Sequence, residues 1–346
     1  MGGAAAMTPA ARTGPEPPSD PLPTVHVVAG VVTDARGRVL LARRAPGREL
    51  AGLWEFPGGK VEAHETPEAA LARELEEELG IRVDVGDPLI TVPHLAPSRH
   101  LRLDVRRISA WRGSAKGLEG QALAWVQAER LPRYDMPAPD RPVVAALLQP
   151  DHCLVTPVPG EADAPWLSAL DGALARGVRR VQFRMPGVDD ARRRRLLAGA
   201  ARRCESAGAQ LLVNGDADLA RESGLGLHLP ASRLRDCTTR PVPADLPFSA
   251  SCHDAGELSM AEALGCDFVL VGPLHATPTH PGQPGIGWQR FVALRERTSL
   301  PIYAIGGLAG TDIAAARQHG AQGIAAIRGL WHPVPPLQDQ LRLRSQ

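Results

Sequence analysis

A segment rich in glutamate and bounded by glycines, residues 59–81, constrains this chain more than any other part of its sequence. Thr66 is a favourable N-cap, Pro67 suits the first helical position, and Gly80 suits a left-handed cap at the C-terminal end. Leucines recur every four residues between these signals, at positions 71, 75 and 79. The segment therefore predicts a short amphipathic helix from about Pro67 to Leu79.

Glutamates crowd the other face of this predicted helix. Glu74, Glu77 and Glu78 are spaced by three and four positions, so they share one face. Like charges at this spacing destabilise an isolated helix, but the arrangement becomes favourable when hard divalent cations bind between the carboxylates. The alternative to a metal site is that these glutamates only form a solvent-exposed acidic face, as charge runs without a motif usually do. The fixed positions of Gly59 and Arg73 favour the metal site.

The segment resembles the signature of the Nudix hydrolases at every fixed position of that signature. The matching positions are Gly59, Glu65 and the run Arg-Glu-Leu-Glu-Glu-Glu-Leu-Gly from 73 to 80. The resemblance implies Mg²⁺, with Mn²⁺ as the alternative ion, and hydrolysis of a diphosphate linkage. It implies metal binding by the Gly59 carbonyl and by Glu74, Glu77, Glu78 and Glu119. It also implies catalytic roles for Glu77, Glu78, Glu119 and Arg73.

Two roles stay open within this resemblance. Arg73 either pairs with Glu65 or orients a metal-binding glutamate. The water molecule that attacks the diphosphate linkage is positioned either by Glu77 or by Glu119. Glu119 lies in the run Lys-Gly-Leu-Glu-Gly-Gln from 116 to 121.

Residues 27–148 are similar to the MutT branch of the Nudix hydrolases, which converts 8-oxo-dGTP to the monophosphate and pyrophosphate and so prevents mutagenic incorporation. The run Gly-Leu-Trp-Glu-Phe-Pro-Gly-Gly-Lys from 52 to 60 leads into the signature as in that branch. The resemblance implies an α/β/α sandwich with a mixed sheet. It also implies that a nucleotide substrate is contacted by Arg44, Phe56, Lys60, Arg99 and Asp140.

Asp140 is a departure from the branch, which often has an asparagine at this place to read the oxidised guanine. An ionised aspartate only accepts hydrogen bonds, whereas asparagine also donates. A protonated aspartate donates as well, if burial raises its pKa. The pyrophosphohydrolase chemistry is therefore better supported than the base preference.

Two strands are predicted near the start of this half. Residues 25–32 and 39–42 are rich in β-branched and aliphatic side chains, and Asp34-Ala-Arg-Gly37 between them predicts a hairpin turn.

Composition limits the classes to which the chain can belong. A length of 346 residues predicts two domains, and a net charge of +1 gives no indication of nucleic-acid binding. Arg192–Arg195 is interpreted as a solvated helix face. The five cysteines form no Cys-x-x-Cys pair, which predicts free thiols in a reducing cytoplasm. No apolar run is long enough to span a membrane. Oligomeric state stays open.

The chain divides into four predicted parts. Residues 1–23 are rich in Ala, Pro and Gly and lack the features of a signal peptide, so we expect a disordered leader, and Met7 is an alternative start. Residues 24–149 form the Nudix part, 151–332 a second domain, and 333–346 a tail.

The second domain is predicted to be a (βα)8 barrel because short apolar strands alternate with helical stretches. The predicted strands are 153–156, 180–183, 211–213, 226–229, 248–252, 268–271, 302–305 and 323–327. The predicted helices between them are 165–176, 190–207, 255–264 and 310–319.

Residues 151–331 resemble thiamine-phosphate synthases and the related thiazole tautomerases. The strings Val-Gln-Phe-Arg184, Leu-Val-Asn214, Gly-Leu-His228-Leu and Ile-Gly-Gly307 stand in the family's order. The resemblance implies phosphate binding by Arg184, Gly307 and Arg328; tight βα turns are the alternative reason for the glycines.

Departures from the synthase pattern concern its charged residues. Gly215 stands where the resemblance implies a magnesium-binding aspartate, and a second such aspartate is replaced by the run from Pro230 to Arg233. The family's lysines are absent after Lys116. Pro273 stands where a tautomerase has its catalytic histidine, with His275 as a substitute. We therefore expect a barrel that binds a phosphorylated small molecule without the synthase reaction.

Three readings of the whole chain remain. The first is a Mg²⁺-dependent 8-oxo-dGTP diphosphatase with a degenerate synthase-like barrel. The second is a bifunctional enzyme of thiamine metabolism that hydrolyses a thiamine-related pyrophosphate. In the third, the barrel is a non-catalytic sensor of a phosphorylated ligand or a dimerisation module.

Overall fold

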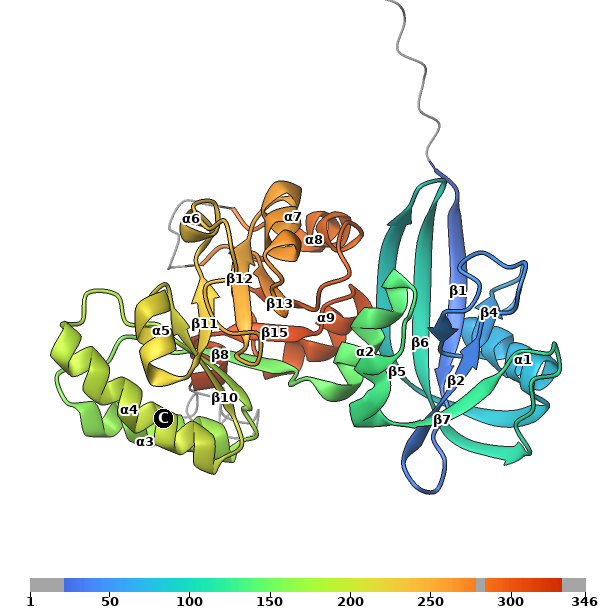
Figure 1. Cartoon of the computed structure of the whole chain (residues 1–346), viewed down its shortest axis with the longest axis horizontal. Coiled ribbons are helices and arrows are strands. Elements are labelled where there is room, and N and C mark those ends of the chain that lie inside the picture. Colours follow the sequence, from blue (N-terminus) through green and yellow to red (C-terminus); the bar gives the residue numbers. More distant parts are fainter. Residues whose placement is uncertain (1–21, 278–283, 332–346) are drawn as a thin grey trace, which may run out of the picture.

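The computed structural model describes residues 22–277 and 284–331, which form two α/β bodies side by side (Figure 1). The expected leader, apart from residues 22 and 23, and the expected tail 333–346 lie outside the described residues.

The N-terminal body contains two sheets. A four-stranded mixed sheet has the order β4-β1-β6-β5, with β1 parallel to β6. Its strands are β1 (Thr24–Val31), β4 (Gly58–Lys60), β5 (Ile81–Ala96) and β6 (Arg99–Gly113). A three-stranded antiparallel sheet has the order β3-β2-β7. Its strands are β2 (Arg38–Arg43), β3 (Trp54–Glu55) and β7 (Leu123–Gln127).

The predicted hairpin turn between the first two strands is present, but the antiparallel pairing next to it is short. The Gly37 amide donates to the Asp34 carbonyl at 2.9 Å, and the Asp34 carboxylate accepts from the Arg38 amide at 2.8 Å. Beyond the turn the strands enter different sheets, and an isolated bridge between Thr33 and Val39 is the pairing recorded there. Both edges of β1 are occupied, by β4 and β6, so β2 cannot pair along it.

Helices cover both faces of these sheets, which confirms the α/β/α sandwich. Val28 belongs to a core beneath α1 (Pro67–Leu79), whereas its neighbour Ala29 belongs to a core on the opposite face. That second core includes residues of η1 (Ala128–Arg133) and α2 (Arg141–Leu148). Successive strand residues point to opposite faces, so one strand serves two cores. Figure 1 shows α2 on the barrel side of the sheet and α1 on the far side.

The C-terminal body is a closed parallel barrel, as predicted. Its strands follow the order β10-β11-β12-β13-β14-β15-β8-β9. They are β8 (His152–Val155), β9 (Arg180–Phe183), β10 (Gln210–Asn214), β11 (Gly226–Leu229), β12 (Phe248–Cys252), β13 (Phe268–Val271), β14 (Ile302–Ile305) and β15 (Gly323–Ala326).

Helices surround this barrel. Four elements match predicted helices: α3 (Asp163–Ala175), α4 (Asp190–Ser206), α7 (Ala255–Ala263) and α9 (Ile313–Gln318), the last preceded by η3 (Gly310–Asp312). Four more were not predicted: α5 (Ala217–Ser223), α6 (Ala231–Leu234), α8 (Gly287–Arg295) and α10 (Arg328–Trp331).

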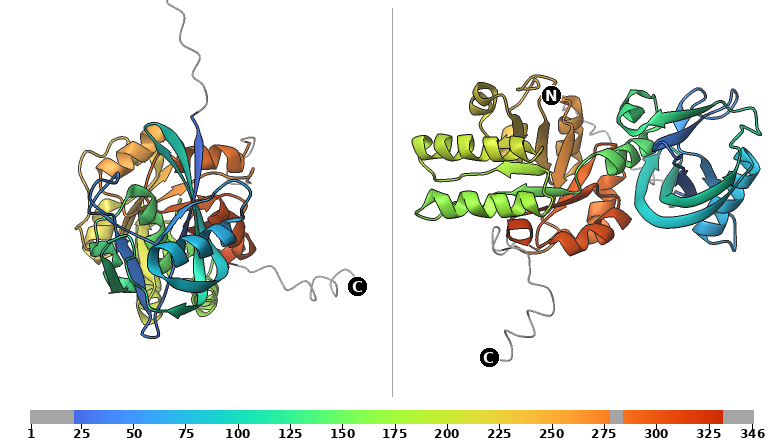
Figure 2. Two further views of the ribbon diagram at one scale, coloured as in Figure 1. Left: turned by 90° about the vertical axis from the view of Figure 1, so that its right-hand side faces the viewer. Right: turned by 90° about the horizontal axis from the view of Figure 1, so that it is seen from below.

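The long strand β5 joins the two bodies, because it packs against α8 and α9 on the outer wall of the barrel (Figure 2). The Leu95 amide donates to the Glu296 carbonyl at 3.0 Å, and His100 Nδ1 lies 3.2 Å from Glu296 Oε1. A Cβ on Gly320 would lie 2.8 Å from Pro93 Cδ, so only glycine permits this approach.

Two expectations from composition can be compared with the coordinates. All five cysteines are free thiols, as predicted. In the described ranges, no helix has the length and apolar character needed to cross a membrane.

Candidate active site

Helix α1 presents the glutamates as its sequence predicts. Thr66 Oγ1 accepts from the Ala69 amide at 3.2 Å, and Gly80 ends the helix with φ of 67°. The apolar stripe of the helix is buried against the sheet. Glu74 and Glu78 are consequently directed away from that core, with side chains that are each 16% exposed.

Gly59 lies in contact with the Glu74 carboxyl group. A Cβ atom built on Gly59 would lie 2.2 Å from Glu74 Cδ, a distance that no side chain tolerates. Strand β4 fixes this glycine because it pairs with β1, Gly59 lying opposite Val28. Glycine is therefore required here to bring a backbone segment and a carboxylate together.

Arg73 holds several carboxylates at once. Its guanidinium lies 2.7 Å from Glu65, 3.0 Å from Glu74 and 3.1 Å from Glu77. The hydrogen bond from Arg73 lowers the pKa of Glu65, and the bond to Glu65 contributes most to raising the pKa of Arg73. The pairing of Arg73 with Glu65 is therefore present, and its contact with Glu74 leaves the second role, orienting a metal-binding glutamate, a prediction.

Hydrogen bonds to the Glu78 carbonyl dock the loop 116–121 on the C-terminal end of α1. The Leu118 amide donates to the Glu78 carbonyl at 2.9 Å, and Gln121 Nε2 donates to the same oxygen at 3.1 Å. The docked loop carries Glu119, whose carboxylate and that of Glu78 both lie near Arg48.

Arg48 bridges these two carboxylates, which sequence reasoning did not foresee. Arg48 Nη2 lies 2.5 Å from Glu119 Oε2, and Nη1 lies 3.9 Å from Glu78 Oε1. The residue belongs to the loop between β2 and β3, which folds back on itself through the bond from the Gly52 amide to the Arg44 carbonyl at 3.0 Å. No local sequence signal links an arginine to partners 30 and 71 positions away.

Burial and neighbouring carboxylates shift the pKa of Glu78 upward. Burial raises the pKa of Glu78 to about 7, and the negative charges of Glu119 and Glu74 add to this effect. A metal ion that binds such a carboxyl group displaces its proton or the arginine that pairs with it.

The residues of this site fit a hard divalent cation by their chemistry. Carboxylate and carbonyl oxygens are the ligands that Mg²⁺ and Mn²⁺ prefer. Among the described residues, however, no three acidic, histidine or cysteine side chains are gathered as a metal-binding group. Arg73 and Arg48 are the cations paired with these carboxylates in the present arrangement.

A second charged cluster lies around Asp140. Its carboxylate accepts from the Phe56 amide at 3.2 Å, and the side chain is 7% exposed. Burial outweighs the hydrogen bond from the Phe56 amide and, together with the charge of Glu55, raises the pKa of Asp140 to about 7. Glu55 itself pairs with Arg44. Because Glu55 also contributes to the raised pKa of Glu78, it connects this cluster electrostatically with the carboxylates of α1.

The other predicted substrate residues have different surroundings. Phe56 is 3% exposed and belongs to the core, and its amide already donates to Asp140. Arg99 lies 2.6 Å from Glu49 of the loop between β2 and β3. Lys60 has an exposed side chain, and its carbonyl accepts from Arg73.

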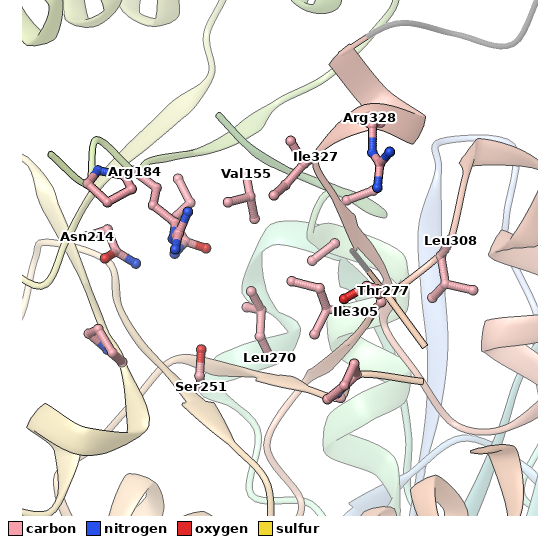
Figure 3. Close-up of a pocket in the computed structure, with 18 of the residues that line it drawn as sticks. Val155, Arg184, Asn214, Ser251, Leu270, Thr277, Ile305, Leu308, Ile327 and Arg328 are labelled. Carbon is pink, nitrogen blue, oxygen red and sulfur yellow. The ribbon is translucent and has the colours of Figure 1, made fainter. Parts of the chain in front are cut away.

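The barrel has a cavity of about 880 Å³ at the carboxyl ends of its strands (Figure 3). All three predicted phosphate-binding residues, Arg184, Gly307 and Arg328, line it. Gly307 has φ of 73°, a backbone conformation that favours glycine. The alternative reason for this glycine, a tight βα turn, is therefore consistent with the structure as well. His275 is not among the described residues that line the cavity.

Comparisons with known proteins match the N-terminal body to nucleotide hydrolases. The family described as "NUDIX domain" matches residues 28–146. An "8-oxo-dGTP diphosphatase" of Proteus vulgaris is 43% identical over 96 residues, which are 28% of this chain and 86% of that protein. A "CTP pyrophosphohydrolase" of Escherichia coli (strain K12) is 36% identical over 124 residues, which are 36% of this chain and 91% of that protein.

The C-terminal body matches a different family. The family described as "Thiamine monophosphate synthase" matches residues 153–330. A "Thiamine-phosphate synthase" of Prochlorococcus marinus (strain MIT 9313) is 32% identical over 200 residues. The match covers 57% of this chain, and the chain spans 57% of the length of that synthase.

The buried Asp140 carboxyl group predicts a stability that depends on pH. Its folded-state pKa of about 7 lies above the ordinary value of 3.8, so between these values the folded state holds a proton that the unfolded state has lost. Stability from this group is complete below about pH 4 and falls as pH rises through 7, by roughly 2–4 kcal/mol in total. Asp140→Asn should lose this dependence, which urea unfolding of both proteins from pH 4 to 8 would measure. If the difference in unfolding free energy between the wild type and Asp140→Asn stayed constant from pH 4 to 8, the raised pKa of Asp140 would be contradicted.

Proposed function

Because the chain belongs to the Nudix family through residues 28–146 and to the thiamine monophosphate synthase family through residues 153–330, we propose that its Nudix domain is a Mg²⁺-dependent nucleoside triphosphate pyrophosphohydrolase. Its proposed main reaction converts 8-oxo-dGTP and water to 8-oxo-dGMP and diphosphate, which keeps the oxidised nucleotide out of DNA. The observation that carries this proposal is the contact of the Glu74 carboxyl group with Gly59, together with the pairing of Glu78 and Glu119 to one arginine, Arg48. The five free thiols support a cytoplasmic setting.

The carboxylates supply the proposed chemistry. Glu74, Glu77, Glu78, Glu119 and the Gly59 carbonyl would hold Mg²⁺ or Mn²⁺. A cation bound there neutralises phosphate charge and lowers the pKa of a water molecule. Glu119 is favoured over Glu77 to position that water, because Glu119 and Glu78 both pair with Arg48. Glu77 is 61% exposed and pairs with Arg73.

Cationic side chains surround the place proposed for the nucleotide. Arg44 pairs with Glu55 and Arg99 with Glu49, and the Lys60 side chain is exposed beside Gly59. We assign phosphate contacts to these three residues, since guanidinium and ammonium groups stabilise developing phosphate charge. The base would be read by Asp140 and the adjoining backbone of Phe56.

A cytosine nucleotide is the second candidate substrate, and Asp140 is the observation that favours it. An ionised aspartate accepts hydrogen bonds and so suits the amino group of cytosine. A protonated aspartate can also donate, as reading an oxidised guanine requires. With a pKa of about 7, Asp140 populates both forms near neutrality. The similarity to a protein named CTP pyrophosphohydrolase is consistent with this alternative.

Glu78→Gln should lower turnover by roughly 100-fold or more, because the neutral amide removes a metal-binding charge at the centre of the group. Steady-state kinetics with 8-oxo-dGTP and Mg²⁺ measure the loss. Glu76→Gln is the matched control, since Glu76 lies on the same helix but pairs with Arg82 outside the group. Near-normal turnover of Glu78→Gln would refute the metal assignment.

Arg48→Ala should bind Mn²⁺ more tightly than the wild type, because the guanidinium competes with the metal for Glu78 and Glu119. The expected gain is roughly two- to fivefold, which corresponds to an exposed ion pair of up to about 1 kcal/mol. Titration calorimetry without a nucleotide measures this affinity independently of turnover. Arg36→Ala, an exposed arginine in the turn after β1, should leave it unchanged. Unchanged or weaker binding by Arg48→Ala would contradict the competition.

The proposed substrate is tested with a panel of 8-oxo-dGTP, dGTP, CTP and thiamine pyrophosphate, with products identified. We expect the highest kcat/KM for 8-oxo-dGTP, with monophosphate and diphosphate as products. A preference for CTP would replace oxidised guanine by cytosine as the recognised base and would leave the proposed pyrophosphohydrolase reaction unchanged. Preference for thiamine pyrophosphate would support the bifunctional alternative, and no Mg²⁺-dependent turnover of any of the four would overturn the proposal.

A further inference from the structure

The segment that joins the two bodies is held at the amino end of the barrel. Only residues 149–151 separate α2, which lies between the bodies in Figure 1, from β8. The Gln149 side chain accepts a hydrogen bond from Arg180 Nη1 at 3.2 Å. Gln322 Nε2 donates to the carbonyls of Gln149 and Pro150, at 3.1 and 3.3 Å. The connection between the bodies is therefore a bound segment of chain and not a free linker.

Arg180 is a buried cation that depends on this segment. It begins β9 and is 3% exposed, so it lies at the end of the barrel opposite the cavity. Its guanidinium donates to Gln210 Oε1 at 2.8 Å and to the Tyr303 hydroxyl at 2.6 Å, and Tyr303 donates to the Pro150 carbonyl. A cation removed from water needs such acceptors. The Gln149 oxygen is one of the acceptors that Arg180 has, and it comes from the end of α2.

Helix α2 connects this contact with the Nudix site. Asp140 is the N-cap residue of the helix, and at the other end the Gln149 amide donates to the Ala145 carbonyl at 2.8 Å. The eight residues of the helix span roughly 12 Å. Its apolar side chains pack on the Nudix core, but apolar packing has no preferred direction. The directional bonds at Gln149 therefore fix the helix along its axis, and with it Asp140.

Asp140 depends on the placement of this helix. Its carboxylate makes no capping hydrogen bond to α2 and accepts from the Phe56 amide at 3.2 Å. Such a bond weakens steeply when donor and acceptor lose alignment. Ala138, two positions earlier, lines a crevice of about 410 Å³ together with Ala255 and Ser259 of α7. The barrel thus adjoins the segment before α2 as well as the segment after it.

We propose that Arg180 is a positioning residue for the Nudix site: through Gln149 and α2, the barrel holds Asp140 where the nucleotide base is read. The inference rests on the proposed function, in which Asp140 contacts the base. It gives the barrel a part in substrate recognition that needs no ligand in its cavity. The metal-binding glutamates lie on α1, on the far side of the sheet from α2 (Figure 1), so metal binding should not depend on Arg180.

Gln149→Leu and Gln149→Glu in the full chain are a matched pair, because leucine removes the acceptor for Arg180 whereas glutamate retains one. Gln149→Leu should raise KM for 8-oxo-dGTP roughly three- to tenfold, as expected for the loss of one hydrogen bond. Its kcat and its Mn²⁺ affinity without a nucleotide should stay unchanged. Gln149→Glu should keep the wild-type KM. So should Gln127→Leu, an exposed glutamine at the end of β7.

Arg180 is tested by Arg180→Lys, since an ammonium group keeps the charge but lacks the fork that reaches three acceptors. This variant should raise KM as Gln149→Leu does, and the double variant should show little further change because both remove the same contact. Additive effects would assign the change to another contact. A lower kcat at unchanged KM would show partial unfolding instead of a positioning role, and would overturn the proposal.

Hydrogen exchange separates the contact from the reaction. The amides of residues 141–148 and of Phe56 should exchange faster in Gln149→Leu than in Gln149→Glu, whether or not a nucleotide is hydrolysed. Equal exchange in both variants would overturn the proposal. Faster exchange with an unchanged KM would remove the role of Arg180 in base recognition and leave the proposed function intact. Faster exchange in a chain whose wild type hydrolyses no nucleotide would overturn the proposed function, and the role at the base with it.

Discussion

Repulsion among the carboxylates of α1 and its docked loop is the constraint around which the N-terminal site is organised. The helix cannot move Glu74 and Glu78 apart, because its leucines are fixed in the core on the opposite face. The loop 116–121 adds a further negative charge through hydrogen bonds that do not depend on charge. The positions are thus imposed by packing and hydrogen bonding, while the balancing charges come from Arg73 and Arg48. Arg48 lies on a separate loop and is 54% exposed, so it is the more readily displaced of the two.

Sequence alone predicts the elements whose signals are local. The cap at Thr66, the leucine spacing and Gly80 define α1 from Pro67 to Leu79, and the structure has those bounds. The eight barrel strands have observed ends within one residue of the predicted ends, because short apolar runs are separated by helical stretches. Motif spacing likewise located the glutamates of α1. These signals act over a few residues, so they can be read from the sequence without the tertiary structure.

The features that sequence missed arise from competition between distant segments. The turn at Asp34–Gly37 has ordinary hairpin chemistry, yet β4 and β6 take both edges of β1 and exclude β2. Arg48 meets Glu119 only after the loops of two separate strands converge. The raised pKa of Asp140 depends on burial beside Phe56, 84 positions earlier in the chain. No window of sequence contains both partners of any such contact.

The two sites of the chain have opposite electrostatic requirements. In the Nudix domain, an excess of carboxylates needs a cation before a polyphosphate can approach. In the barrel, Arg184 and Arg328 face a cavity without described carboxylates, so an anion can approach directly. Each site is built from residues of its own body, and β5 packs against α8 and α9 on the outside of the barrel. The chain therefore joins two bodies whose candidate sites have opposite charge: carboxylates on α1 in one, and arginines lining the barrel cavity in the other.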